Sequence, residues 1–180
     1  MMAVSRKEHQ ILIVHEYIHG ANLHQILHRK CPIKISERTK TAYLTDWGLA
    51  NMRDSLAQFG AAAPGDFCGP QGAGTDLYMA PEIFLHNSHC TTMSDMWSLG
   101  LTYLEMFTSC EPWTLNNRSA LNGLLSKQEP PHALAKLQPH LTDIVKPLVE
   151  YKPESRMNSK DLVACLKSKV DLVKRYGYTW

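Results

Sequence analysis

The segment from Met93 to Phe107 constrains the fold of this chain more than any other part of the sequence. Methionine, tryptophan, leucine, tyrosine and phenylalanine fall on every side of a helical wheel drawn over it. A helix that is apolar all round has to be covered by other parts of the chain. We therefore expect this helix to be buried at the centre of a mainly α-helical fold.

Two more helices are predicted on the C-terminal side of this segment. Apolar residues follow one helical stripe over residues 141–149, with Pro147 inside it. A proline in a helix removes a hydrogen bond and collides with the preceding turn, so we expect a kink there. Asn158 is suited to cap a last helix, whose apolar positions include Leu162 and Leu166.

The N-terminal part of the chain is predicted to contain β-structure. Residues 10–17 are rich in β-branched side chains and are bounded by the polar residues 6–9, as a buried strand would be. A short helix is expected to begin at Asn22 and to end near Lys30. Residues 32–45 are typical of a β-hairpin, and residues 51–75, rich in Gly, Pro and Ala, of a long surface loop.

The amino-acid composition indicates which partners and which cell compartment to expect. The chain has 180 residues, enough for one domain, with 44% hydrophobic and 20% charged residues and a formal net charge of +2. This balance favours neither nucleic acid nor an anionic membrane as a partner. Its 5 cysteines include no C-x-x-C pair, and no segment is long enough to span a bilayer. We expect a cytoplasmic protein with reduced thiols.

The segment around Asp46 is the most informative about function. Asp46-Trp47-Gly48 is followed 34 residues after the aspartate by Ala80-Pro81-Glu82. With this spacing the chain resembles the protein kinase family, whose D-F-G and A-P-E motifs bracket the activation segment. The resemblance implies that Asp46 is a ligand of Mg²⁺, with Trp47 in place of the usual Phe.

Further motifs extend the resemblance to serine/threonine kinases. Residues 74–82 match G-T-x-x-Y-x-A-P-E, which implies a substrate platform that includes Gly74, Thr75 and Tyr78. Residues 94–100 are similar to the S-D-x-W-S-L-G that opens the central helix of the family, with Asp95 as its aspartate. Residues 151–156 are similar to the D-P-x-x-R near the end of the domain. In the family this arginine pairs with the A-P-E glutamate, which implies a buried ion pair between Arg156 and Glu82.

Residues 13–23 are similar to the kinase hinge, the strand that meets the adenine ring of ATP. The resemblance places His15 at the gatekeeper position, Glu16, Tyr17 and Ile18 at the backbone contacts to adenine, and Asn22 near the ribose. The alternative is a plain connection between a strand and a helix that binds no nucleotide. The cofactors implied by the resemblance are ATP and Mg²⁺.

The parts of a kinase that transfer phosphate are missing from the sequence. Kinases use a Gly-rich loop, a strand lysine paired with a helix glutamate, and an H-R-D-x-x-x-x-N loop. In one register the chain passes at about Cys31 directly into the hairpin before Asp46, without the catalytic loop. In the other, His28-Arg29-Lys30 replaces H-R-D. Both registers lack the catalytic aspartate, so no catalytic residue is assigned and weak or no nucleotide binding is expected.

A zinc-peptidase motif competes for the same region. Residues 15–19 read His-Glu-Tyr-Ile-His and fit H-E-x-x-H, in which two histidines one helical turn apart bind zinc. The segment runs from β-branched residues into Gly20, which is poor context for a zinc-binding helix. The kinase-like interpretation is therefore preferred.

The expected fold is mainly α (α+β): the C-terminal lobe of a protein-kinase-like fold, with a remnant hinge strand and a short β-hairpin. We expect one truncated domain over residues 1–180, in which 9–30 form the hinge strand and following helix, 31–82 the metal-binding hairpin and activation segment, and 83–180 the helical lobe. Two functions remain open. One is an inactive, partner-binding lobe of the pseudokinase type, and the other an active serine/threonine kinase represented by an incomplete gene model or splice form.

In the register that passes at about Cys31 directly into the hairpin, the long helix that precedes the catalytic loop of kinases is missing as well. Without it, apolar surface beside Met96 and Tyr103 would be uncovered. We therefore expect the chain to need a partner protein for its stability. An inactive lobe is expected to bind its partner through the platform of residues Tyr78 to Glu82 and a helix that begins near Leu121.

Overall fold

The protein is described from a computed structural model, in residues 3–7, 10–14, 22–28, 76–115 and 117–176. The chain forms two compact units, Met1–Thr41 and Ala42–Trp180. Each unit is described by itself below.

The N-terminal unit contains a β-hairpin and a short helix. Strand β1 (Ala3–Lys7) pairs antiparallel with β2 (Gln10–Val14), so that Ala3 lies opposite Val14. Helix α1 (Leu23–His28) follows, and its predicted end near Lys30 lies outside the described residues. The prediction of a strand is confirmed over β2. The interpretation of residues 6–9 as a polar boundary was wrong for Arg6 and Lys7, which belong to β1, because pairing with β2 overrides the low strand propensity of such residues.

Several predicted features fall outside the described residues. These are the last three residues of the predicted strand, the hairpin of residues 32–45 and the surface loop of residues 51–75. They stay predictions.

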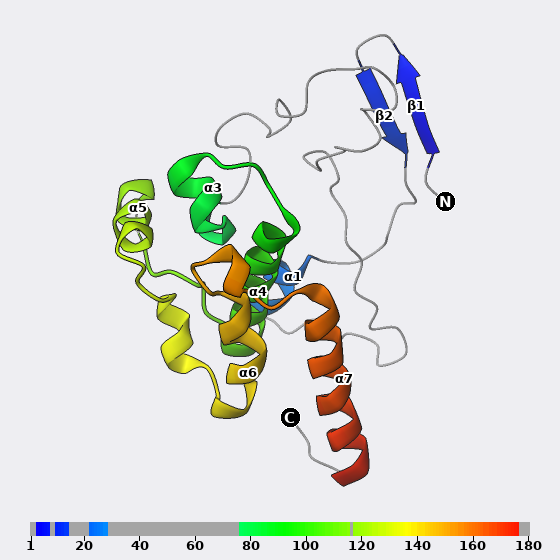
Figure 1. The fold of residues 1–180 in the computed structure, drawn as a ribbon, viewed down its shortest axis with the longest axis vertical. Helices are drawn as coiled ribbons and strands as arrows, with labels where there is room; N and C mark the ends of the chain where they lie inside the picture. The colour runs from blue at the N-terminus through cyan, green and yellow to red at the C-terminus, as the bar shows by residue number, and fades with distance from the viewer. Residues whose placement is uncertain (1–2, 8–9, 15–21, 29–75, 116, 177–180) are drawn as a thin grey trace. The chain divides into compact units, whose positions relative to one another are not determined.

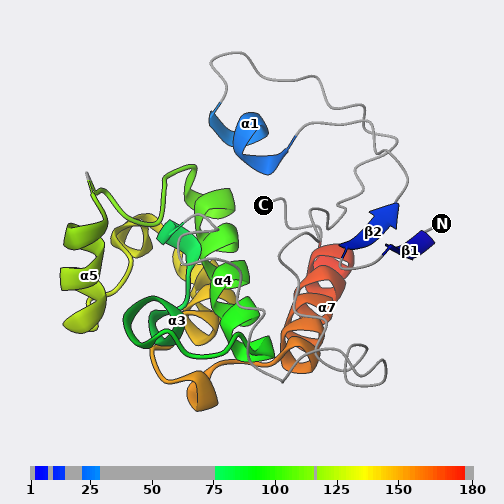
Figure 2. The same ribbon diagram turned by 90° about the horizontal axis from the view of Figure 1, so that it is seen from above.

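The C-terminal unit is helical. Its α-helices are α3 (Pro81–His86), α4 (Thr92–Thr108), α5 (Arg118–Ser126), α6 (Thr142–Val145) and α7 (Ser159–Tyr176). Short 3₁₀ turns connect them: η2 (Asp76–Tyr78), η3 (His132–Lys136), η4 (Pro139–Leu141), η5 (Lys146–Leu148) and η6 (Pro153–Ser155). Figures 1 and 2 both show α4 running between α5 and α7.

Helix α4 is the central helix that the sequence predicts. Thr91 and Ser94 form a reciprocal capping box at its start, and Ser109 ends it in the left-handed conformation. Its buried apolar residues join those of α5, α6, η5 and α7 in one core. The core residues of α4 are Met96, Trp97, Leu101 and Leu104.

Burial of α4 is less complete than predicted. Met106 is 39% exposed, Asp95 is exposed and Tyr103 is half-buried. The expectation of a helix buried all round is therefore wrong for Asp95 and Met106, which do not belong to the core. Met96 itself is buried in the core, and the predicted uncovered surface beside it stays a prediction.

Pro147 divides the predicted helix of residues 141–149. The α-helical part, α6, ends at Val145, and η5 continues as a 3₁₀ turn that includes the proline. A proline has no N–H to donate to the preceding turn, which explains the change of helix type. The change of helix type at Pro147 is observed, and the kink itself stays a prediction.

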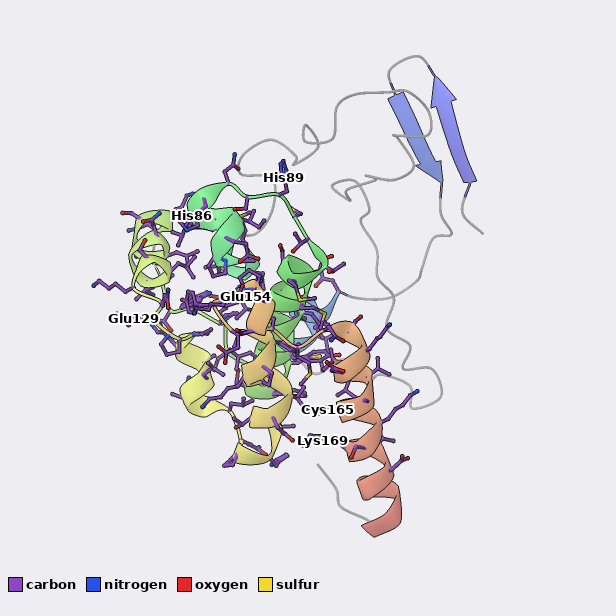
Figure 3. The ribbon with its side chains drawn as sticks, in the orientation of Figure 1. His86, His89, Glu129, Glu154, Cys165 and Lys169 are labelled. Carbon is purple, nitrogen blue, oxygen red and sulfur yellow. The ribbon has the colours of Figure 1, made fainter. Side chains whose placement is uncertain are left out.

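Helix α7 begins as the sequence predicts and packs on α6. The Asn158 Oδ1 atom accepts hydrogen bonds of 3.0 Å from the backbone N–H groups of Lys160 and Asp161. Lys169, which lies between α7 and α6 (Figure 3), forms an ion pair of 2.8 Å with Asp143. Among the described residues no helix is long and apolar enough to cross a bilayer.

Gly100 lets α4 approach η5 closely. A Cβ atom at this position would lie 2.6 Å from Leu148 Cβ and 2.9 Å from Val149 Cγ1. We expect Gly100→Ala to lower the free energy of unfolding by about 1 to 3 kcal/mol, because overpacking outweighs the better helix propensity of alanine. Urea denaturation measures the change.

Gly123 in α5 provides the matched control for this substitution. A Cβ atom there would meet no atom within 4 Å, so Gly123→Ala is expected to stabilise the protein by about 0.5 to 1 kcal/mol. Equal effects of the two substitutions would contradict the close approach of α4 and η5.

Candidate functional site

The turn η2, which carries the predicted platform residue Tyr78, is bound to the helical unit by its backbone carbonyls. The indole Nε1 of Trp113 donates a hydrogen bond of 3.0 Å to the carbonyl of Leu77. The hydroxyl of Ser98 donates one of 2.8 Å to the carbonyl of Tyr78. Trp113 is buried in the core and Ser98 lies on α4, so η2 is fixed to rigid parts of the unit.

The side chain of Tyr78 is bound as well. Its hydroxyl donates a hydrogen bond to the carboxylate of Glu105, a buried residue of α4. Burial raises the pKa of the Tyr78 phenol well above its usual value of 10.0, and the hydrogen bond and negative charge of Glu105 raise it further. The phenol is therefore a stable hydrogen-bond donor at neutral pH.

Glu82, on α3, forms the ion pair with Arg156 that the resemblance implies. Arg156 Nη1 and Nη2 donate hydrogen bonds of 2.7 Å each to the two carboxylate oxygens of Glu82. The Arg156 side chain is 0% exposed and that of Glu82 is 16% exposed. Such a bidentate pair fixes both the distance and the orientation of the two groups.

Arg156 has further partners that satisfy its remaining donors. It donates to the backbone carbonyls of Met93, Glu150 and Tyr151, at 2.9, 2.7 and 3.2 Å. Its guanidinium carbon lies 5.1 Å from the ring centroid of Trp97, within the range of a cation–π contact. Arg156 therefore joins α3, α4 and the segment before η6.

The pKa of Glu82 gives the ion pair a pH dependence. Burial alone would raise this pKa, but the hydrogen bonds and charge of Arg156 lower it below the usual 4.5. A carboxylate with a lowered pKa stabilises the folded state above its unfolded-state pKa, and this contribution disappears as pH falls through the folded-state value. Below pH 4.5 we therefore expect the wild type to lose more stability than Glu82→Gln.

Urea denaturation of both proteins between pH 3 and pH 7 measures this difference. The two free energies of unfolding are expected to converge as pH falls. Parallel curves over the whole range would contradict a charged Glu82 in the folded protein.

The other predicted site residues fall into two groups. Asp95 lies exposed in the first turn of α4, where partial desolvation raises its pKa, and Asn22 is an exposed residue directly before α1. The rest lie outside the described residues: His15, Glu16, Tyr17, Ile18, Asp46, Gly74 and Thr75. Within the described ranges, no group of three or more His, Cys, Asp or Glu side chains could hold a metal ion.

Three residues that bind η2 were not singled out from the sequence: Glu105, Trp113 and Arg118. Glu105 is a carboxylate among the apolar residues of the C-terminal half of α4, and a buried charge needs a hydrogen-bond partner, so its pattern could have identified it. No comparable pattern marks Trp113 or Arg118, because their contacts with η2 depend on the tertiary fold.

The sequence was compared with known protein families. Residues 37–166 match the protein kinase domain family. The chain belongs to the protein kinase family. The matched range includes Asp46, Tyr78, Glu82, Asp95 and Arg156.

The kinase relatives of this chain include serine/threonine kinases from distant organisms. It is 31% identical to a probable serine/threonine-protein kinase of Dictyostelium discoideum and 28% identical to serine/threonine-protein kinase sid1 of Schizosaccharomyces pombe, over 81% and 86% of its length. It is 29% identical to human mitogen-activated protein kinase kinase kinase 1 over 86% of its length. The matched regions span 27%, 31% and 10% of these relatives.

Proposed function

We propose that this chain is a serine/threonine kinase-like domain that binds a partner protein and does not itself transfer phosphate. The observation that carries the proposal is the set of hydrogen bonds and the ion pair that hold η2 and Glu82 against later parts of the helical unit. Side chains of α4, the segment after it and Arg156 hold the end of the activation segment in one place. A surface held in this way is preorganised for recognition of another protein.

The sequence before Asp46 supports the absence of phosphate transfer. A kinase needs an aspartate that accepts the proton of the substrate hydroxyl. In the register that aligns His28-Arg29-Lys30 with H-R-D, a lysine occupies that position. An ammonium group has no lone pair with which to accept a proton or a hydrogen bond. The other register contains no catalytic loop.

Phosphate transfer and nucleotide binding are tested on the full chain. The protein is incubated with Mg²⁺ and radiolabelled ATP, alone and with a generic basic protein substrate, and its thermal midpoint is followed as Mg²⁺-ATP is added. We expect no incorporation above that of Asp46→Ala and no saturable rise of the midpoint. Incorporation, or a saturable shift that Asp46→Ala abolishes, would overturn the proposal.

The segment from Tyr78 to Glu82 and the exposed side of α5 are the proposed binding surface for the partner. Gly123 lies on that side and has open space around it, so Gly123→Arg adds a bulky charge without disturbing the core. Val163→Arg places the same charge on the exposed surface of α7. A protein that is captured by the wild type and by Val163→Arg, but not by Gly123→Arg, is the expected result. Equal capture by both variants would contradict this surface.

The second candidate function is that of an active, ATP-dependent serine/threonine kinase. The motifs from Asp46 to Arg156 and the kinase relatives favour it. In that case genomic sequence around the codon of Cys31 encodes an H-R-D-containing segment, and transcripts that retain it exist. A genomic sequence without such a segment would exclude this alternative.

A further inference from the structure

Arg118, the first residue of α5, contacts two other elements of the helical unit. Its Nη1 atom lies 2.5 Å from Asp76 Oδ2, in an ion pair with the first residue of η2. Its guanidinium carbon lies 4.6 Å from the ring centroid of Phe84, on α3, in a cation–π contact. One side chain therefore joins η2, α3 and α5.

The start of α5, where Arg118 lies, is itself held in place. Asn117, the residue before it, caps α5 by accepting a hydrogen bond of 2.8 Å from the N–H of Ala120. Leu121 and Leu125 bury the inner side of α5 in the core. Since the start of α5 is held by its cap and its core residues, the Arg118 side chain extends from a fixed point.

The position of Asp76 depends on Arg118 more than the positions of Leu77 and Tyr78 do. Trp113 and Ser98 donate to the carbonyls of Leu77 and Tyr78, and the Tyr78 hydroxyl donates to Glu105. Among the described residues, Arg118 is the side chain that binds the Asp76 carboxylate. The Asp76 side chain is 27% exposed, and its Oδ1 atom is buried without a hydrogen-bond partner in the described part of the chain. A partly buried carboxylate with one unsatisfied oxygen is costly to keep without a nearby positive charge.

We propose that Arg118 is the positioning residue of η2: its ion pair with Asp76 fixes the first residue of this turn to α5, so that η2 and α5 present one ordered surface. The significance of this surface for partner binding rests on the proposed function. The ordering of η2 by Arg118 is independent of the proposed function, because the ion pair lies within this chain.

Hydrogen exchange at Met79 reports on the order of η2. The N–H of Met79 donates a hydrogen bond of 3.1 Å to the carbonyl of Asp76 and closes the turn. In Arg118→Ala we expect this amide to exchange roughly three- to tenfold faster, the range for losing an exposed ion pair and a cation–π contact. Arg118→Lys, which keeps the charge, is expected to restore part of the protection.

Two controls separate positioning from a general loss of stability. Lys127→Ala removes a charge from the other end of α5 and is expected to leave Met79 exchange unchanged. The Arg118 side chain is 53% exposed, so the urea midpoint of Arg118→Ala is expected to stay close to that of the wild type. The double variant Asp76→Arg, Arg118→Asp reverses the pair and is expected to recover most of the protection.

Unchanged Met79 exchange in Arg118→Ala would overturn the proposal. So would an equal acceleration of amides in α4 and α6, because that would indicate a purely structural role. Faster Met79 exchange in Arg118→Ala, together with equal capture of a partner by wild type and Gly123→Arg, would support positioning by Arg118 and reject the binding surface.

Discussion

Replacing Arg156 by alanine is expected to lower the free energy of unfolding by about 3 to 5 kcal/mol. The substitution removes a fully buried guanidinium and leaves the Glu82 carboxylate without its bidentate partner. It also leaves the carbonyls of Met93, Glu150 and Tyr151 without this donor. The loss is measured by urea denaturation at pH 7.

Arg118→Ala is the matched control for this substitution. Both arginines pair with a carboxylate and lie near an aromatic ring, but Arg118 is mostly exposed. Its loss is expected to cost about 1 kcal/mol or less. Similar costs for the two substitutions would contradict the burial of Arg156 and the role of its pair with Glu82 in holding α3.

Trp113→Ala is expected to have an effect of similar size, about 3 to 5 kcal/mol. The indole ring is buried in the core, and its removal leaves a cavity that the surrounding helices cannot fill. The substitution also removes the hydrogen bond to the Leu77 carbonyl, so the order of η2 is expected to decrease. Urea denaturation measures the first effect, and hydrogen exchange at Met79 the second.

Trp113→Phe separates the two contributions. Phenylalanine keeps most of the buried aromatic surface but has no N–H, so it is expected to accelerate Met79 exchange with a much smaller loss of stability. If Trp113→Phe destabilises the protein as strongly as Trp113→Ala, the effect comes from the hydrogen bond rather than from packing.

Much of the helical unit could be predicted from the sequence because its determinants are local. The apolar pattern of Met93–Phe107 places α4 within one residue at each end, and Pro147 marks the end of α6. Asn158 marks the start of α7. Capping, periodicity and the missing N–H of proline act over a few residues, so a single sequence reveals them.

The features that could not be predicted depend on distant parts of the chain. Strand β1 has a single strongly strand-forming residue, Val4, and its pairing with β2 decides its structure. Which residues of α4 are exposed depends on the elements that pack against this helix. For the site, family motifs identified Glu82 and Arg156, whereas the pairing of Arg118 with Asp76 has no sequence pattern, since 42 residues separate the two.

The bonds that hold η2 and Glu82 form only after their later partners in the sequence have been synthesised. The partners of η2 follow it by 20, 27, 36 and 42 residues, and Arg156 follows Glu82 by 74. A ribosome adds roughly 5 to 20 residues per second, so several seconds pass between the appearance of Glu82 and that of Arg156. During this interval the nascent segment lacks its final ion pair, and we expect it to be less ordered than in the finished chain.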